Sequence, residues 1–290
     1  MRSRLALALL ASLAFPAAAL AEGKLKVDTI TAAPGGFLVN AALVSGEKDA
    51  VLIDSSMALP DAHRVVARVL ESGKNLTTVY VTHAHPDHYF GLLVVKQAFP
   101  KAKLVTLPAA LAEMKKTWKG KVAQWGPMMG QNLTAKPVLP AALAGSTIDL
   151  EGEKLEVVGG LQGDGASSSY VWIPSARTVI AGDIVFDGVH PWTAETTPET
   201  RKNWIAALDQ IVALKPVAVV PGHQTPEMKQ DPKNVESTKK YLLAFDEALA
   251  ASKSSDELQT KMKAKYGKLA LDIILKIGAD AAFAPKPPAK

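Results

Sequence analysis

The feature that most constrains this chain is a run of β-type residues that ends directly in a cluster of histidines. Residues 79–82, Val-Tyr-Val-Thr, are followed by His83, His85, Asp87 and His88. Half of the six histidines in the 290-residue chain therefore fall within six residues. Histidines two positions apart at a strand end can present both imidazoles to one side of a loop, and the next two side chains can aim at a neighbouring point. The pattern predicts a metal site with a geometry that suits two ions.

Composition limits what such a site can contain. The chain has no cysteine, so disulfides, thiolate nucleophiles and thiolate ligands are all excluded. A metal site must therefore be built from imidazole and carboxylate groups. With 48% hydrophobic and 21% charged residues, the chain has enough apolar side chains for a large core and no disordered-type bias.

The N-terminus has the pattern of a secretory signal. Arg2 and Arg4 precede an apolar run over residues 5–15, and Ala19-Leu20-Ala21 forms a small-x-small cleavage site. We expect a signal peptide at 1–21, cut after Ala21, and a periplasmic or secreted protein. The apolar run is shorter than the about 20 residues that span a bilayer, and no later stretch is long enough, so we expect no stable membrane anchor after signal removal.

The charge distribution argues against a nucleic-acid partner. The net charge of +5 falls to +3 without Arg2 and Arg4, and residues 252–290 carry +4, so residues 22–251 are near −1. A basic segment without interleaved aromatic residues is typical of a solvated helix face. We expect a small-molecule substrate and no nucleic acid, and the sequence leaves the oligomeric state open.

Apolar patterning predicts strands first and helices after them, twice along the chain. In the first half we expect strands at 25–31, 37–44, 50–53, 77–82 and 103–106, and helices at 60–72, 90–98 and 108–132. In the second half we expect strands at 147–150, 154–158, 169–173, 178–181 and 217–220, and a helix at 198–214. From residue 231 the chain reads as helices, with Ser254 and Glu257 as a capping box.

These elements predict an α+β fold, a four-layer αβ/βα sandwich with two inner mixed β-sheets covered by outer helices. We expect a single domain over residues 22–290 with a helical C-terminal extension at about 232–284. The segment 108–132, rich in Trp and Met, fits either ordinary core packing or a flap over the active site.

The motif His83-x-His85-x-Asp87-His88 after a strand resembles the signature of the metallo-β-lactamase fold superfamily. Two later motifs strengthen the resemblance, which extends across nearly the whole mature chain. Apolar runs lead into Gly182-Asp183 and Gly222-His223, in the order and context in which the family carries a bridging aspartate and a last histidine.

The chain departs from the family pattern at residues 161–167. Family members usually have a Gly-His loop there, whereas this sequence offers Asp164. Zinc accepts a carboxylate oxygen about as readily as an imidazole nitrogen, so Asp164 can serve as a ligand. The alternatives are that Asp164 only forms hydrogen bonds and leaves a weak site, or that the changed ligand set favours iron or manganese.

The resemblance implies two ligand sets. His83, His85 and Asp164 would hold one ion, Asp87, His88 and His223 the other, and Asp183 would bridge them. The expected cofactor is Zn²⁺, two ions per chain, with iron or manganese as alternatives. A water shared by two such ions is acidified and attacks the substrate, and we expect Asp87 to be the catalytic residue that orients it and carries its proton.

Two further residues are candidates for supporting roles. Asp54 ends the apolar run 51–53, where the family often has a carboxylate behind the ligands, and we favour support of the ligand loop over a plain turn residue. His190 lies seven residues after Asp183 and lines the substrate cleft or is simply packed. His63 begins a predicted helix far from any motif, and we assign it no role.

The sequence thus favours an exported metal-dependent hydrolase that attacks a small carbonyl substrate such as a lactam, lactone, ester or thioester. β-Lactam hydrolysis suits an exported protein, but no residue selects it. One alternative is a single-iron, sulfur-processing oxygenase of the same fold, which His88 and His223 argue against because one iron needs no second ligand set. The other is a metal-binding protein without turnover.

Overall fold

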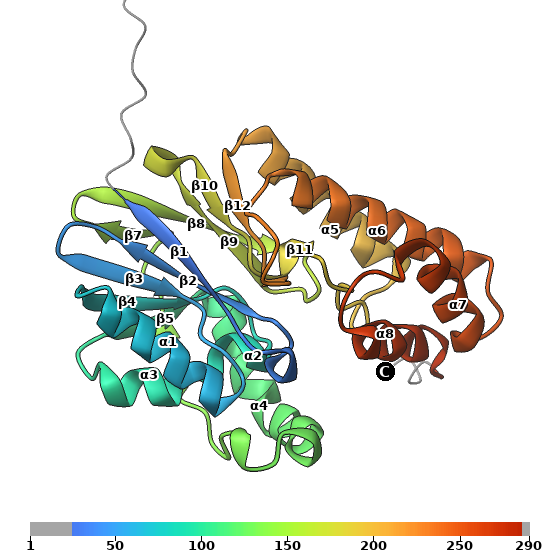
Figure 1. Ribbon diagram of the computed structural model, residues 1–290, viewed down its shortest axis with the longest axis horizontal. Coiled ribbons are helices and arrows are strands. Elements are labelled where there is room, and N and C mark those ends of the chain that lie inside the picture. Colours follow the sequence, from blue (N-terminus) through green and yellow to red (C-terminus); the bar gives the residue numbers. More distant parts are fainter. Residues whose placement is uncertain (1–24, 286–290) are drawn as a thin grey trace, which may run out of the picture.

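The computed structural model describes residues 25–285, and the predicted signal peptide and its cleavage site lie outside this range (Figure 1). Two β-sheets face each other in the centre of the molecule, and helices cover the outer face of each. The predicted four-layer α+β sandwich with two inner mixed sheets is confirmed.

The first sheet has six strands in sequential order and is antiparallel at its start and parallel after that. Its strands are β1 (Lys26–Thr31), β2 (Asn40–Ser45), β3 (Asp49–Ile53), β4 (Asn75–Val81), β5 (Lys103–Thr106) and β6 (Ala141–Ala142). The helices of this half are α1 (Leu59–Glu71), α2 (Pro86–Tyr89), α3 (Leu92–Ala98) and α4 (Pro108–Met129). They pack on the outer face of the sheet through one large hydrophobic cluster.

The second sheet has the order β12-β10-β9-β8-β7, with β10 and β12 parallel and the other pairs antiparallel. Its strands are β7 (Thr147–Leu150), β8 (Glu153–Leu161), β9 (Ser168–Ile173), β10 (Thr178–Ile180) and β12 (Ala218–Val220), and a separate short pair joins β11 (Phe186–Asp187) to β13 (His223–Gln224). The helices that follow are α5 (Pro198–Ala213), α6 (Lys233–Ala250), α7 (Ser255–Tyr266) and α8 (Asp272–Phe283). Short 3₁₀ turns are η1 (Pro34–Gly36), η2 (Gly130–Asn132), η3 (Pro174–Ala176) and η4 (Gly182–Ile184).

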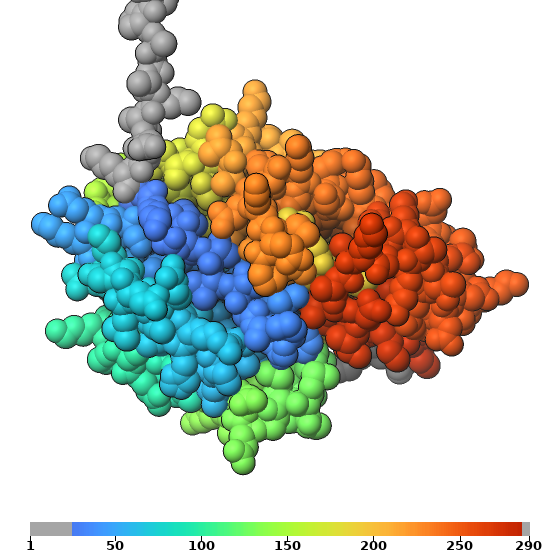
Figure 2. Space-filling model, in the orientation of Figure 1, coloured from blue at the N-terminus to red at the C-terminus, as the bar shows by residue number. Residues whose placement is uncertain are grey.

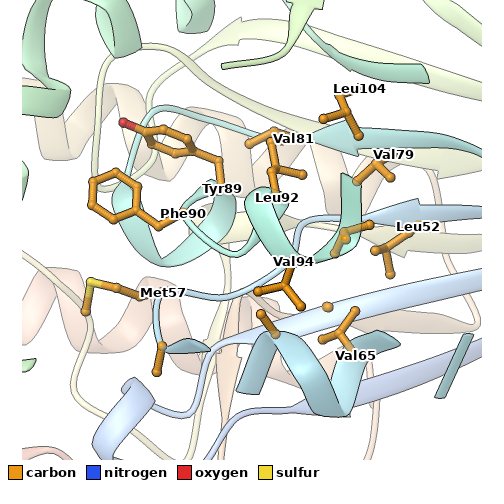
Figure 3. Packing of buried hydrophobic residues seen from close by; sticks show 14 of the residues in the cluster. Leu52, Met57, Val65, Val79, Val81, Tyr89, Phe90, Leu92, Val94 and Leu104 are labelled. Carbon is orange, nitrogen blue, oxygen red and sulfur yellow. The ribbon is translucent and has the colours of Figure 1, made fainter. Parts of the chain in front are cut away.

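The cores follow from the apolar pattern of the strands. Val44 and Tyr80 of the first sheet and Val171 and Ile180 of the second belong to one buried cluster between the sheets. Strands buried on both faces are almost continuously apolar, and fully burying one such side chain contributes roughly 1.5–3 kcal/mol. Figure 3 shows the outer cluster of the first half, where side chains of the α2–α3 segment pack on those of β4 and β5.

The structure corrects three predicted element boundaries. The strand expected at 37–44 begins only at Asn40, because Phe37 and Leu38 have φ values of 61° and 57° and complete the turn after η1. The helix expected at 90–98 is α3, which begins at Leu92, and Phe90 and Gly91 separate it from the short helix α2, which the sequence did not predict. The helix expected at 108–132 ends at Met129 and continues as η2.

The C-terminal helices pack against the body of the molecule as well as against each other. Ser254 caps α7 by accepting a hydrogen bond from the Glu257 backbone N–H, while the Glu257 carboxylate accepts from the backbone of Lys253 instead of closing the expected capping box. Figure 2 shows these helices, in red, meeting the blue segment near residue 35. Within residues 25–285, no helix combines the length and apolar character needed to cross a membrane.

Candidate metal centre

Strand ends bring the predicted ligands to one edge of the sandwich. His83 follows the end of β4 by two residues. Ile180 and Val220 are paired in the parallel strands β10 and β12, and Asp183 and His223 each follow their strand by three residues. Equal offsets from a paired position place these two side chains next to each other.

The loop between β8 and β9 adds Asp164 to this edge. Its backbone N–H donates to the carbonyl of Asp183 at 3.2 Å, and its side chain is completely buried. The ligand-type residues fall into two groups. The first group is His83, His85, Asp164 and Asp183, and the second group is Asp87, His88 and His223.

The first group is compact. His85 Nδ1 lies 2.7 Å from Asp164 Oδ2. His83 Nε2 lies 3.7 Å from both Asp164 Oδ1 and Asp183 Oδ2. These separations surround a common point with two nitrogens and two carboxylates.

The second group shares Asp183 with the first. Asp183 Oδ1 lies 3.1 Å from His88 Nε2, and its Oδ2 lies 3.2 Å from His223 Nε2. Asp87 Oδ2 is 3.2 Å from the same His223 nitrogen. Asp183 therefore occupies the position between the groups that a bridging ligand requires.

Outer hydrogen bonds fix the histidine tautomers in the second group. His88 Nδ1 is 2.8 Å from Asp54 Oδ2, and His223 Nδ1 is 2.7 Å from the Phe37 carbonyl oxygen. A carboxylate or carbonyl oxygen only accepts, so both Nδ1 atoms carry the proton. Each Nε2 then presents a lone pair to the centre, as a metal ligand must.

The same logic holds for the first group. Thr82 donates its hydroxyl proton to Asp54 Oδ2 at 2.8 Å, so its oxygen accepts from His83 Nδ1 at 3.0 Å. His85 is reversed: its outer nitrogen is Nε2, which donates to Glu195 Oε2 at 3.4 Å and leaves Nδ1 for the centre. In their neutral form, all four histidines thus turn the nitrogen without a proton inward.

The inward atoms fit a divalent metal. His83 Nε2, His88 Nε2, Asp164 Oδ1 and Asp183 Oδ1 are buried without a hydrogen-bond partner, which costs about 1–3 kcal/mol per group. Ligands at 2.0–2.2 Å from a tetrahedral zinc are roughly 3.3–3.6 Å apart, close to the separations found here. Imidazole and carboxylate together are a ligand set for zinc and its neighbours in the first transition row.

The carboxylates make the centre favour bound protons or another positive charge. Burial lowers the pKa of His223, but Asp183 and Asp87 outweigh it and raise the value to about 10. Burial raises the pKa of the Asp164 carboxyl to about 8, against the opposing effect of His85. A metal ion competes with these protons for the same atoms, so metal affinity falls as the pH decreases.

Two glycines allow this close packing. Gly182 has a φ of 49° and directly precedes Asp183. A Cβ on Gly222 would overlap Asp183 Oδ1. The Gly-Asp and Gly-His motifs are therefore steric requirements of the centre as well as turn signals.

The family model of the metallo-beta-lactamase superfamily matches residues 34–223, which are more than half of the chain. The matched range includes all seven ligand-type residues. The chain belongs to the metallo-beta-lactamase superfamily. Among curated proteins, the uncharacterized protein YobT of Bacillus subtilis is 39% identical over 77 residues, which are 26% of this chain and 32% of YobT.

Solved structures of metallo-beta-lactamase proteins share the fold at low sequence identity. A family protein from Thermus thermophilus is 19% identical with a TM-score of 0.63, over 87% of this chain and 91% of that protein. A metallo-beta-lactamase from Pontibacter korlensis is 21% identical with a TM-score of 0.59, over 76% of this chain and 95% of the other. At these identities the likeness establishes the architecture alone.

Within this metallo-beta-lactamase fold, Asp54 and His190 lie in different surroundings. Asp54 is buried and has a φ of 63°. It accepts hydrogen bonds from the backbone and hydroxyl of Thr82 and from His88, so it connects the end of β4 to α2. His190 is buried and lines the cavity above the centre. His63 lies exposed on α1.

An ion pair at the cavity, Lys121 with Glu195, was not predicted from the sequence. Lys121 of α4 lines the cavity and pairs with Glu195 at 2.5 Å, and Glu195 also accepts from His85. Neither residue belongs to a motif, and Glu195 is 110 positions from His85, so no pattern in the sequence identified them. Of the two interpretations of residues 108–132, core packing is confirmed for Met114 and Met129. Lys121 and Trp125 of the same helix line the cavity, and the flap stays a prediction.

Proposed function

We propose that this protein is an exported metal-dependent hydrolase that acts on a small carbonyl compound such as a lactam, lactone, ester or thioester. The observation that carries the proposal is the position of the two adjoining ligand groups, whose side chains His85, Asp87, Asp164, Asp183 and His223 line one cavity.

Two zinc ions are the proposed cofactors. His83, His85 and Asp164 would hold one, Asp87, His88 and His223 the other, and Asp183 both. When bound, such ions acidify a water molecule and polarise a carbonyl oxygen. Two histidines and a carboxylate also suit iron, which supports the single-iron oxygenase as the second candidate, but the intact second group disfavours it.

Asp87 is the proposed catalytic residue. Its side chain lines the cavity and is 15% exposed, more than the ligand-type side chains around it. Burial raises its pKa, but His88 and His223 outweigh burial and hold the pKa below its usual range. The carboxylate is thus ionised, as a group that orients an attacking water must be, and we assign it the transfer of that water's proton to the leaving group.

Turnover by the zinc-loaded mature protein tests this function. The protein is assayed with a neutral ester, a lactone, a thioester and a lactam, and compared with Asp87→Asn and with His63→Gln as a control on the exposed face of α1. We expect kcat to fall about 10²–10⁴-fold in Asp87→Asn alone. Equal turnover of the two variants would refute the role of Asp87, and no turnover of any substrate would favour a metal-binding protein without activity.

We also propose a periplasmic or secreted location and a small-molecule partner. The signal-like residues 1–21 support a periplasmic or secreted protein, and the near-neutral charge of residues 22–251 supports a small molecule and not a nucleic acid as partner. Cell fractionation with N-terminal sequencing tests the location. Recovery of the uncut chain in the cytoplasm would contradict it.

A further inference from the structure

We infer that the cavity binds an uncharged carbonyl compound carrying an aromatic or branched apolar group, and discriminates against anionic analogues. The inference rests on the proposed hydrolase function and names the substrate class for the same site.

The apolar walls come from distant parts of the chain. Phe37, Trp125 and Trp192 form one aromatic wall, in which the Phe37 and Trp125 rings are 5.1 Å apart and the two indoles 6.1 Å. Leu271 and Ile274, at the start of α8, add an aliphatic wall. Such walls gain most from an apolar group, at about 25 cal/mol for each Å² removed from water.

The apolar wall begins directly at the metal centre. The Trp192 ring lies 6.5 Å from the ring of His85, a residue of the first group. A compound whose carbonyl reaches the centre therefore places its adjoining group against the aromatic wall.

The one lysine or arginine among the described residues that line the cavity already has an anionic partner. This residue is Lys121, and its side chain is 14% exposed. Its ammonium group is 2.5 Å from Glu195 Oε1. An anionic substituent placed against the aromatic wall, away from the ligand groups, would have to displace Glu195 from Lys121 or stay unpaired, and an unpaired charge against apolar side chains is costly.

Neutral hydrogen-bond donors are available instead. Tyr241 Oη lies 2.9 Å from His190 Nδ1, and His190 Nε2 lies 3.7 Å from the Asp272 carboxylate, which favours the tautomer with the proton on Nε2 and the Tyr241 hydroxyl as donor to Nδ1. His190 Nε2 and Trp192 Nε1 are both buried without a partner, on two residues that line the cavity. Two uncharged N–H groups match the oxygen of an ester, lactone or amide.

A matched pair of esters tests the inference by hydrolysis. 4-Methylphenyl acetate carries a neutral methyl group at the para position, where 4-acetoxybenzenesulfonate carries an anionic sulfonate. The sulfonate compound has the better leaving group, so its intrinsic reactivity is higher, and a preference for the methyl compound must come from binding. We expect kcat/KM to be at least about tenfold higher for the neutral ester. In Glu195→Gln, which frees Lys121, this ratio should fall about fivefold, as expected for release of a partly exposed ion pair. The ratio cancels any loss of metal, and Lys119→Gln on the exposed face of α4 is the control.

Binding of the corresponding amides tests the inference without turnover. N-(4-methylphenyl)acetamide should quench the tryptophan fluorescence of the zinc-loaded protein at lower concentration than 4-acetamidobenzenesulfonate. Trp192→Phe should weaken this binding. Trp118→Phe should not, because Trp118 is a partly buried residue of α4 that packs against the core and does not line the cavity. Equal binding of the two amides would overturn the inference; selective binding without hydrolysis of either ester would uphold it and refute the proposed hydrolase.

Discussion

The two ligand groups are supported from outside in different ways. In the second group, the outer nitrogens of His88 and His223 are held by Asp54, 3% exposed, and by a backbone carbonyl, both at the ends or turns of the first sheet. In the first group, the outer nitrogen of His85 is held by Glu195, a loop residue that is 37% exposed, over a longer distance. The second group is pre-organised by the sandwich, and the first depends in part on the substrate cavity.

This difference matters because outer partners set ligand orientation and metal affinity. The first group is also where Asp164 stands in place of the family's usual histidine. We therefore expect the two proposed sites to differ in affinity, with the second the tighter one. Substitutions in and around each group should distinguish the two affinities.

Asp183→Asn should have the largest effect, because Asp183 contacts both groups. We expect loss of both ions and a fall in activity greater than the about 10–100-fold that loss of an outer partner costs. Elemental analysis of the purified protein, together with kcat on the best substrate, checks this. Retention of one ion would show that Asp183 serves a single site.

Asp164→Asn should affect the first group alone. The amide keeps the shape of the carboxylate and removes the charge, so we expect metal content to fall from about two ions per chain to about one. The measurement is zinc per chain after dialysis, with wild type alongside. Two retained ions would mean that Asp164 only forms hydrogen bonds, and a single iron in the wild type would favour the oxygenase.

Asp54→Asn and Glu195→Gln compare the outer partners directly. Asp54→Asn should weaken the tighter ion about 10–100-fold and, through Thr82 and His83, the other ion to a smaller extent. Glu195→Gln should weaken the first group's ion alone, and less than about tenfold, because Glu195 is exposed and distant. Competition with a chelator gives both affinities, and Glu199→Gln on α5 is a control. A larger loss in Glu195→Gln would reverse the comparison.

Substitution of His190, which lies outside both ligand groups, should have the smallest effect, a change in how the stability of the fold depends on pH. Burial lowers its pKa to about 4, so the folded state resists a proton that the unfolded chain accepts near its ordinary value of 6.5. Stability should therefore fall as the pH decreases from 6.5 to 4, by up to about 1.4 kcal/mol per pH unit.

The check is denaturant unfolding of the zinc-loaded protein across this pH range. The free energy of unfolding of the wild type minus that of His190→Gln should decrease as the pH falls, because the glutamine does not titrate. A difference independent of pH would contradict the assignment of a neutral buried imidazole.

The sequence predicted the fold and the gathered ligands because both depend on local patterns. His83 to His88 are contiguous, and Asp183 and His223 each follow an apolar strand through a glycine that the packing requires. The strand boundary at Phe37 was wrong because its apolar side chain resembles a strand residue while its backbone turns with positive φ.

The cavity was not predictable in the same way. Lys121 and Glu195 sit in a helix and a loop with no motif, and their roles arise only when α4 and the loop meet over the centre. Trp125 fits a core residue and a cavity wall equally well, and its buried position serves both.

The position of α8 divides the site along the chain. The Ala270 backbone N–H donates to the Gly188 carbonyl, and the Ala270 carbonyl accepts from the His190 N–H, which fastens the start of α8 to the cavity loop. All seven ligand-type residues precede residue 224, whereas Leu271 and Ile274 of the cavity wall follow residue 270. A chain cut before residue 270 would carry every ligand-type residue and lack one wall of the cavity, so truncation can separate the residues that gather at the centre from those that shape the space beside it.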